Sequence, residues 1–291
     1  MVHNGVICVN KPSGMTSHDV VAAIRRVFGQ KTGHTGTLDP AARGVLPICL
    51  GAATKLAQIM SDSDKAYRVE IIFGAETDTQ DFTGNITRRA PVAFGEDEFM
   101  AAISSFAGEY NQLPPMYSAV KVGGRKLYEL AREGVEVARK PRMIHIHDIK
   151  AESLDLPQRA VIFVRSSKGA YMRTLCEDIG KRLDTAAHMG QLLRTEAAGF
   201  TLQNAHALDA LSIGNIIPIT EIPALRPLPR LSVAPHLDKR LLSGGVLRAD
   251  DFDKTPEFDK MLMFTSGGVL AGIYTLEQNE TFLQYKPFIM L

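Results

Sequence analysis

One carboxylate, Asp39, lies in a segment whose residue types could hold a reactive acid in place: GHTGTLDPAARGVLPICLGAATKL, residues 33–56. Pro40 fixes its own φ and biases Asp39 toward extended backbone. Gly36 and Gly44 allow the chain to turn tightly or to approach a ligand closely, and His34 adds a titratable base. The alternative is structural, because an Asp-Pro pair commonly begins a turn or caps the helix that follows. The residues alone leave both interpretations open.

Five segments of the chain resemble, in the same order, the motifs of the bacterial tRNA pseudouridine synthase B (TruB) family. The Asp39 segment matches the pattern GHTGxLDPxAxGVLPxCxGxATK. The other four are NKPSGMTSHDVV at residues 10–21, KAYRVEIIFGAETDTQD at 65–81, QLPPMYSAVKVGGRKLYELAREG at 112–134 and SKGAYMRTLCEDIG at 167–180. The resemblance implies conversion of the T-loop uridine of tRNA, at position 55, to pseudouridine. One departure is Leu193, which stands where the family usually has a second arginine before Arg194 and puts one phosphate or structural contact in doubt.

The resemblance implies three catalytic residues. Asp39 matches the catalytic carboxylate, and Tyr67 matches the ring that stacks on the target base and acts in the late proton transfer. Arg173 matches the cation that pairs with Asp39 and favours its ionised form. Structural alternatives are a half-buried strand aromatic for Tyr67 and a surface ion pair with Glu177, one helical turn away, for Arg173.

Three further residues match family positions that contact the substrate. A stacked base must be extracted at a cost of a few kcal/mol, and His34 matches the residue that contacts the displaced region of the loop. Tyr171 and Leu192 match positions that line the uracil pocket, although Leu192 taken alone would be a core residue. We expect Lys11 and Pro12 to support the Asp39 loop rather than to react.

A carboxylate is sufficient for this chemistry. The bond between C1′ and N1 breaks, the base rotates, and C1′ joins C5 without redox change. The acid can attack covalently, or it can remove a proton and stabilise positive charge on the ribose. The sequence leaves open whether Asp39 attacks C1′, attacks C6 or removes the C2′ proton. Since the chain contains neither GxxxxGK[ST] nor GxGxxG, we expect no nucleotide cofactor, and we expect no metal.

Any RNA-binding surface must be local, because 33 basic and 32 acidic residues leave a net charge of only +1. Residues 121–142 carry seven basic and three acidic side chains, with Tyr117, Tyr128 and a Gly-Gly pair nearby. This mixture favours a loop that grips the T-arm, whereas a solvated helix face is the alternative. The basic residues that we expect to contact RNA are Lys121, Arg125, Lys126 and Arg132.

Hydrophobic periodicity predicts a mixed α+β fold. Apolar spacing predicts helices over residues 20–28 and 172–183 and strands over residues 67–73 and 159–166. Thr16 or Ser17 would cap the first helix, and Gly29 would end it. The resemblance sharpens this to the pseudouridine synthase fold, a central and mostly antiparallel sheet with flanking helices and loops.

Five prolines between residues 218 and 235 predict a linker. We therefore expect a catalytic domain at residues 1–230, with a basic RNA-gripping insertion at about 115–142, and a small β-rich domain at residues 231–291. The tail resembles a PUA-like RNA-binding domain. Its six basic and eight acidic residues leave open whether it contacts RNA or only supports the catalytic domain.

Cysteine usage and hydropathy indicate a soluble, cytoplasmic protein, and we expect a monomer. Cys8, Cys49 and Cys176 have neither CxxC spacing nor the pattern of a disulfide framework. No stretch approaches the roughly 18 apolar residues that a spanning helix needs.

Two other classes of function remain open. The run HIHD at residues 145–148 places His145 and His147 on one face of a strand beside Asp148, as in a metallohydrolase, although the sequence shows no further ligand cluster. A non-catalytic RNA-folding factor could use the same surface as the enzyme. The intact set of Asp39, Tyr67 and Arg173 argues against a dead enzyme but is compatible with a second, tRNA-folding role.

Overall fold

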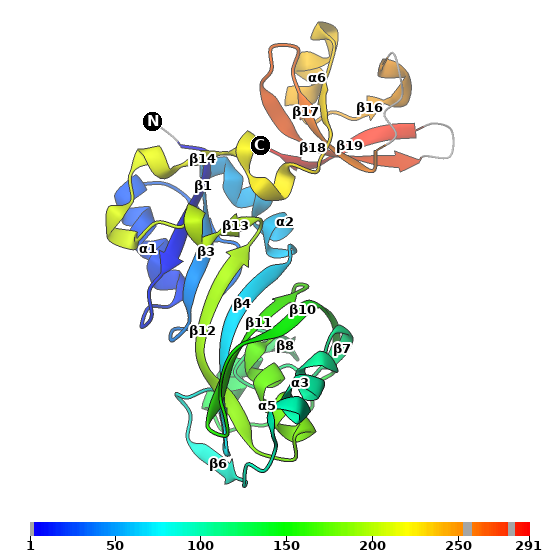
Figure 1. Ribbon diagram of the computed structural model, residues 1–291. Helices are drawn as coiled ribbons and strands as arrows, with labels where there is room; N and C mark the ends of the chain where they lie inside the picture. Colours follow the sequence, from blue (N-terminus) through cyan, green and yellow to red (C-terminus); the bar gives the residue numbers. More distant parts are fainter. Residues whose placement is uncertain (1–2, 253–257, 279–282) are drawn as a thin grey trace.

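The computed structural model describes residues 3–252, 258–278 and 283–291, and within them the strands form a large and a small sheet (Figure 1). The large sheet has the order β14-β1-β3-β12-β4-β11-β10-β7, with β2 paired to β3 and β13 to β12. Its strands are β1 (Gly5–Lys11), β2 (Thr32–His34), β3 (Arg43–Leu50), β4 (Lys65–Phe73), β7 (Gly108–Gln112), β10 (Arg142–Asp155), β11 (Arg159–Ser166), β12 (Ala187–Ala197), β13 (Phe200–Thr201) and β14 (Ile217–Pro218). All these pairings are antiparallel except β12 with β3, so the sheet is mostly antiparallel as predicted.

The small sheet has the order β15-β17-β18-β19-β16. Its strands are β15 (Arg230–Ser232), β16 (Leu247–Arg248), β17 (Lys260–Phe264), β18 (Leu270–Gln278) and β19 (Leu283–Met290). Two short ribbons pair β5 (Ala75–Thr77) with β6 (Ile86–Arg89) and β8 (Lys121–Val122) with β9 (Arg125–Lys126). The helices are α1 (Ser17–Phe28), α2 (Ala57–Ser61), α3 (Glu96–Ser104), α4 (Leu127–Arg132), α5 (Met172–Arg182) and α6 (Asp238–Leu242).

Helix α1 begins and ends where its capping residues predict. The Thr16 hydroxyl accepts from the backbone N–H of Asp19 at 3.0 Å, and the Asp19 carboxylate accepts from the backbone N–H of Thr16 at 2.8 Å. Together they form a capping box. Gly29 ends the helix with a φ of 62°, a left-handed conformation that glycine adopts without strain.

The helices cover the large sheet at its two ends (Figure 1). Helix α1 packs Val20 and Ile24 on β1 and β3 in one buried cluster, whereas α3 and α5 pack Phe99 and Leu175 on β4, β10 and β11 in another. Between them the parallel contact of β3 with β12 brings Gly44 against Arg194. At residue 44 a Cβ would lie 2.2 Å from the carbonyl oxygen of Arg194, so only glycine permits this approach.

The prediction of a linker at residues 218–235 is wrong. This segment forms one-turn 3₁₀ helices and the short strands β14 and β15, and it buries Ile219, Ile222 and Leu225. Proline suits the first turn of a helix and extended backbone, so the apolar residues between the prolines can still pack.

The small sheet shares a core with the large one. Leu262 and Ile273 of the small sheet lie in the same buried cluster as Val6 and Phe200 of the large sheet, and the Lys55 ammonium donates to the carbonyl of Met290 at 2.8 Å. The expected domain boundary at residue 230 stays a prediction. Within the described residues, no helix is long and apolar enough to cross a membrane.

Candidate active site

Asp39 lies in a tight turn between β2 and β3. Its carbonyl accepts from the backbone N–H of Ala42 at 3.0 Å, and strand β3 follows directly. The alternative that Asp39 caps a following helix is therefore wrong. The turn is fastened to α1, because the Ser17 hydroxyl accepts from the backbone N–H of Leu38 at 2.8 Å and donates to its carbonyl at 3.0 Å.

Lys11 supports the same turn through its ammonium group. Its ammonium donates to the carbonyls of Pro12, Met15 and Pro40 at 2.9, 2.5 and 3.1 Å, and the residue is fully buried. Burial lowers the pKa of Lys11 to about 8, although the charge of Asp39 opposes the shift. Lys11 thus holds the backbone beside Asp39, as the sequence predicted.

Arg194 holds the turn from the side of the sheet. From β12 its guanidinium donates to the carbonyls of Val45, Gly36 and Thr37 at 2.8, 3.1 and 3.3 Å. Burial lowers the pKa of Arg194, and the hydrogen-bonded Tyr67 opposes this shift. The sequence identifies Arg194 only as the neighbour of Leu193 and predicts no role for it in the site. Its place on the same strand face as the buried Leu192 was a signal that could have identified it.

Arg173 is paired with Asp39. The Nε atom of Arg173 lies 3.1 Å from Oδ2 of Asp39, and the Arg173 side chain is 8% exposed whereas that of Asp39 is 38% exposed. The guanidinium also donates to the carbonyls of Tyr117 at 2.8 Å and Thr79 at 3.3 Å. The alternative of a surface pair between Arg173 and Glu177 is wrong, since Arg173 is buried against the Asp39 turn. The Asp39 carboxylate is thus paired with a fixed cation and remains partly exposed.

Tyr67 lies on β4 opposite Arg194 in the antiparallel register of β4 and β12. It is 7% exposed, so it is more buried than the half-buried strand aromatic that the alternative expected. Burial raises the pKa of the Tyr67 phenol, while the charge and hydrogen bond of Arg194 oppose the shift. Arg194 therefore connects the backbone of the Asp39 turn with the Tyr67 hydroxyl.

His34 lies at the start of the same loop. Its Nδ1 accepts from the backbone N–H of Gly36 at 3.3 Å, and its ring packs edge-on against His18 with centroids 5.4 Å apart. Burial lowers the pKa of His34, and the neighbouring His18 and Arg194 lower it further. We infer a neutral imidazole that carries its proton on Nε2.

Of the two expected pocket residues, Tyr171 precedes the helix that carries Arg173, and Leu192 lies on the strand that carries Arg194. Tyr171 directly precedes α5, where its backbone N–H donates to Gln112 at 2.7 Å and its carbonyl accepts from Gln112 at 2.9 Å. Leu192 on β12 is 8% exposed and belongs to the core cluster that contains Tyr67 and Val69. Their roles toward a substrate stay predictions.

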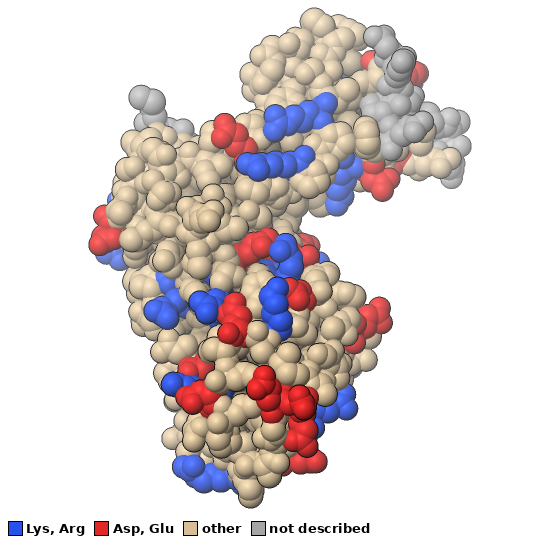
Figure 2. Space-filling model, viewed as in Figure 1, with Lys and Arg blue, Asp and Glu red and all other residues tan. Residues whose placement is uncertain are grey.

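The four basic residues expected to bind RNA lie on a small unit of β8, β9 and α4. Lys121, Arg125 and Arg132 are exposed, and Lys126 is half-buried. Arg125 forms an ion pair with Glu133, while Lys126 and Arg132 lie over the Tyr128 ring, at 5.3 and 5.5 Å from its centroid. Figure 2 shows basic and acidic side chains interspersed over the face in view, in keeping with the small net charge.

The two histidines of the metallohydrolase hypothesis lie together, but they have no set of further ligands among the described residues. The His145 and His147 rings lie 4.7 Å apart, and His147 contacts Asp64 at 3.2 Å. Asp148 pairs with Lys150 at 2.9 Å, and an irregularity of β10 separates it from Ile146 in the pairing with β11. In the described part of the chain, no group of three or more His, Cys, Asp or Glu side chains could hold a metal ion.

Comparison with known families identifies two matching models. The model of the TruB family pseudouridylate synthase N-terminal domain matches residues 25–172, and that of the tRNA pseudouridylate synthase B C-terminal domain matches residues 173–216. The chain is 46% identical over 247 residues to tRNA pseudouridine synthase B of Alkaliphilus oremlandii, covering 83% of this chain and 82% of that protein. It is 42% identical over 293 residues to the protein of the same name from Clostridium kluyveri, covering 98% and 100%.

Solved structures show the same fold. A chain of a Cbf5-Nop10-Gar1 complex superposes with a TM-score of 0.74 at 24% identity, covering 99% of this chain and 84% of that chain. A chain of the archaeal box H/ACA sRNP Nop10-Cbf5 complex gives a TM-score of 0.71 at 22% identity, covering 99% and 87%. With the family models, these comparisons confirm the predicted pseudouridine synthase fold, and the small sheet is consistent with the predicted PUA-like domain.

Proposed function

The chain belongs to the TruB family of pseudouridylate synthases, and we propose that it converts the T-loop uridine at position 55 of tRNA to pseudouridine, with Asp39 as the catalytic carboxylate. The observation that carries the proposal is the ion pair of Asp39 with the buried Arg173. A partly exposed carboxylate held by a buried cation has one fixed partner and remains accessible to a substrate.

Three cationic side chains hold Asp39 and the loop around it. Arg173 binds the carboxylate, whereas Lys11 and Arg194 donate to backbone carbonyls of the loop, and Arg194 also bonds the Tyr67 hydroxyl. Two of the cations therefore hold the loop backbone, and the Asp39 carboxylate is paired with Arg173. Such preorganised charge needs little rearrangement as positive charge develops on the ribose.

Tyr67 would stack on the extracted uracil and take part in the late proton transfer. The raised pKa keeps its phenol protonated near neutral pH, and Arg194 would stabilise a transient phenolate. Tyr171 and Leu192 would line the uracil pocket, and His34 would contact the displaced region of the T-loop through its Nε2–H.

The basic side chains at 121, 125, 126 and 132 would grip T-arm phosphates, because most of them are exposed and the same unit carries an aromatic ring. We also propose a cytoplasmic location, since the three cysteines are free and buried. A monomeric state stays a prediction, which light scattering in solution would test.

The test is to incubate an unmodified tRNA transcript with the protein and to map pseudouridine at nucleotide resolution. We expect product at position 55 alone. A matched transcript with cytidine at that position should yield none, because it lacks the uracil to be isomerised. Product only at another uridine would contradict the assigned position, and a lack of any product would contradict the proposed activity.

A further inference from the structure

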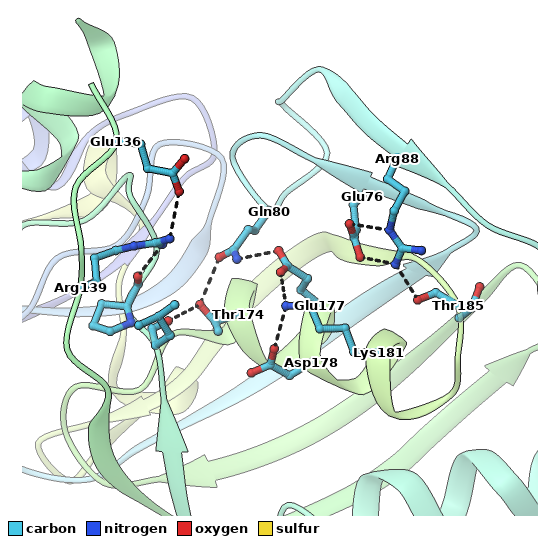
Figure 3. Close-up of polar contacts among 12 residues, drawn as sticks. Glu76, Gln80, Arg88, Glu136, Arg139, Thr174, Glu177, Asp178, Lys181 and Thr185 are labelled. Atoms are coloured by element: carbon cyan, nitrogen blue, oxygen red, sulfur yellow. Dashed lines mark hydrogen bonds and ion pairs between the residues drawn. The ribbon is translucent and has the colours of Figure 1, made fainter. Parts of the chain in front are cut away.

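A loop residue, Gln80, is bound to the helix that carries Arg173 (Figure 3). Its side-chain amide donates to Glu177 at 2.6 Å, and its side-chain carbonyl accepts from the Thr174 hydroxyl at 3.1 Å. Thr174 and Glu177 are one helical turn apart on α5, and Thr174 directly follows Arg173. The amide therefore bridges two successive positions on one face of the helix.

The residue before Gln80, Thr79, contacts Arg173 through its backbone. The carbonyl of Thr79 accepts from Nη1 of Arg173 at 3.3 Å. Gln80 has a φ of 62°, an uncommon conformation for a residue other than glycine, and its carbonyl accepts from the backbone N–H of Met189 at 3.0 Å. Tertiary contacts on both sides of the 79–80 peptide thus hold it in one orientation.

Glu177 is itself held in place for this contact. One carboxylate oxygen accepts from Gln80, and the other lies 2.5 Å from the ammonium of Lys181, with the Glu177 side chain only 16% exposed. The four side chains of Lys181, Glu177, Gln80 and Thr174 form one hydrogen-bonded row, which Figure 3 shows along α5. The row ends beside Arg173.

We propose that Gln80 is a positioning residue for the reaction: it docks the 79–80 peptide on α5 so that the Thr79 carbonyl orients the Arg173 guanidinium toward Asp39. This inference rests on the proposed function. The guanidinium is planar, so fixing Nη1 on Thr79 and Nη2 on Tyr117 also fixes the direction of Nε. In this proposal Gln80 acts through Arg173, because its side chain bonds Thr174 and Glu177 of α5.

The first test replaces Gln80 by methionine, which keeps the length of the side chain and removes both hydrogen bonds. We expect the single-turnover rate on an unmodified tRNA transcript to fall about 10- to 100-fold, since small misplacements of a catalytic group have effects of this size. The Kd for the transcript should stay within about threefold, because the substitution leaves the RNA-binding side chains unchanged. Equal losses in rate and in binding, or no loss in either, would overturn the proposal.

The matched control is Glu76→Gln in the neighbouring β5–β6 ribbon. It weakens the ion pair of Glu76 with Arg88, which Figure 3 shows beside the Gln80 row but which does not contact Arg173. We expect the rate of this variant to equal that of the wild type. A loss as large as that of Gln80→Met would mean that any polar change near this loop slows the reaction, and would overturn a specific role for Gln80.

Exchanging the amide of Gln80 with the carboxylate of Glu177 distinguishes a positioning role of Gln80 from a general loss of folding. Gln80→Glu places two carboxylates against each other and should slow the reaction at least as much as Gln80→Met. The double variant Gln80→Glu, Glu177→Gln restores an amide facing a carboxylate, and we expect it to recover most of the rate. Failure of the double variant to recover, with a thermal midpoint equal to that of the wild type, would contradict the proposal.

The same assay distinguishes this inference from the proposed function. Product from the wild type together with unchanged rates in the Gln80 variants would overturn the positioning role alone. A lack of product from the wild type would overturn the proposed function and the positioning role with it.

Discussion

The Asp39 loop and the basic unit of β8, β9 and α4 are held in opposite ways. The loop presents its carbonyls to buried side chains: Arg194 binds Gly36 and Thr37, Ser17 binds Leu38, and Lys11 binds Pro40. In the basic unit, the four side chains expected to bind RNA are largely exposed, and within α4 only Leu127 and Leu130 are buried.

The difference reflects what each region has to do. A buried polar group left without its partner costs about 1–3 kcal/mol, so each contact of the Asp39 loop strongly favours one conformation. An exposed ion pair such as Arg125 with Glu133 contributes little, and it can be exchanged for a phosphate. A catalytic carboxylate needs a loop held in one conformation. Contact with an irregular RNA surface tolerates exposed side chains that can change partners.

The largest effect should come from the acid itself. Asp39→Asn keeps the size of the side chain but can neither attack nor accept a proton usefully, so product should be abolished while tRNA binding stays within about tenfold. Nucleotide-resolution mapping and a filter-binding assay measure the two quantities. Turnover by a preparation free of wild-type protein would refute the assignment of Asp39.

Tyr67 should separate stacking from proton transfer. Tyr67→Phe keeps the ring and should retain binding but lose most turnover, whereas Tyr67→Leu should lose both, since stacking on a base is worth ~1–3 kcal/mol. Single-turnover rates and dissociation constants for the two variants make the comparison. Wild-type turnover by Tyr67→Phe would restrict this residue to packing.

The basic unit should affect binding without affecting chemistry. Replacing Arg125, Lys126 and Arg132 by glutamine should weaken tRNA binding and lower the slope of log affinity against log salt by roughly one unit for each phosphate that is no longer neutralised. The single-turnover rate at saturating protein should stay near that of the wild type. The readout is a salt titration of tRNA binding.

The matched comparison for that experiment is substitution of Lys260 and Lys286 in the small sheet by glutamine. Truncating the chain at this sheet would expose the core that Leu262 and Ile273 share with Val6, so substitution is the cleaner test. We expect a much smaller change in slope. If the salt slope changes only in this second variant, the main RNA contact lies on the small sheet instead.

The smallest effect concerns the pH dependence of stability. Because folding lowers the pKa of Lys11 from 10.5 to about 8, the unfolded chain binds more protons between these values, and this lysine stabilises the fold increasingly as pH rises. The free energy of unfolding of the wild type, relative to Lys11→Met, should therefore increase by about 1–3 kcal/mol from pH 7 to pH 10. Denaturant titrations measure it, with the exposed Lys121→Met as control. A difference that falls with pH would contradict the burial of a charged Lys11.

Much of the secondary structure could be predicted from the chain. The apolar spacing and caps of α1 and the alternation of β4 and β11 are local properties, and the structure confirms them. The predicted pairing of Arg173 with Asp39 is also present, but it came from a resemblance, because the two residues are distant in sequence and no spacing rule connects them.

The tertiary structure decided which groups meet. Proline content predicted a linker at residues 218–235, yet its apolar residues pack in a core that the two sheets share. Arg194 contacts the carbonyl of Val45, 149 residues earlier, and Gln80 contacts α5 across 97 residues. Helix caps and strand alternation act over a few residues and can be recognised in the chain. The partner of a buried cation depends on the register of strands distant in sequence, and that register emerges only when the whole sheet assembles.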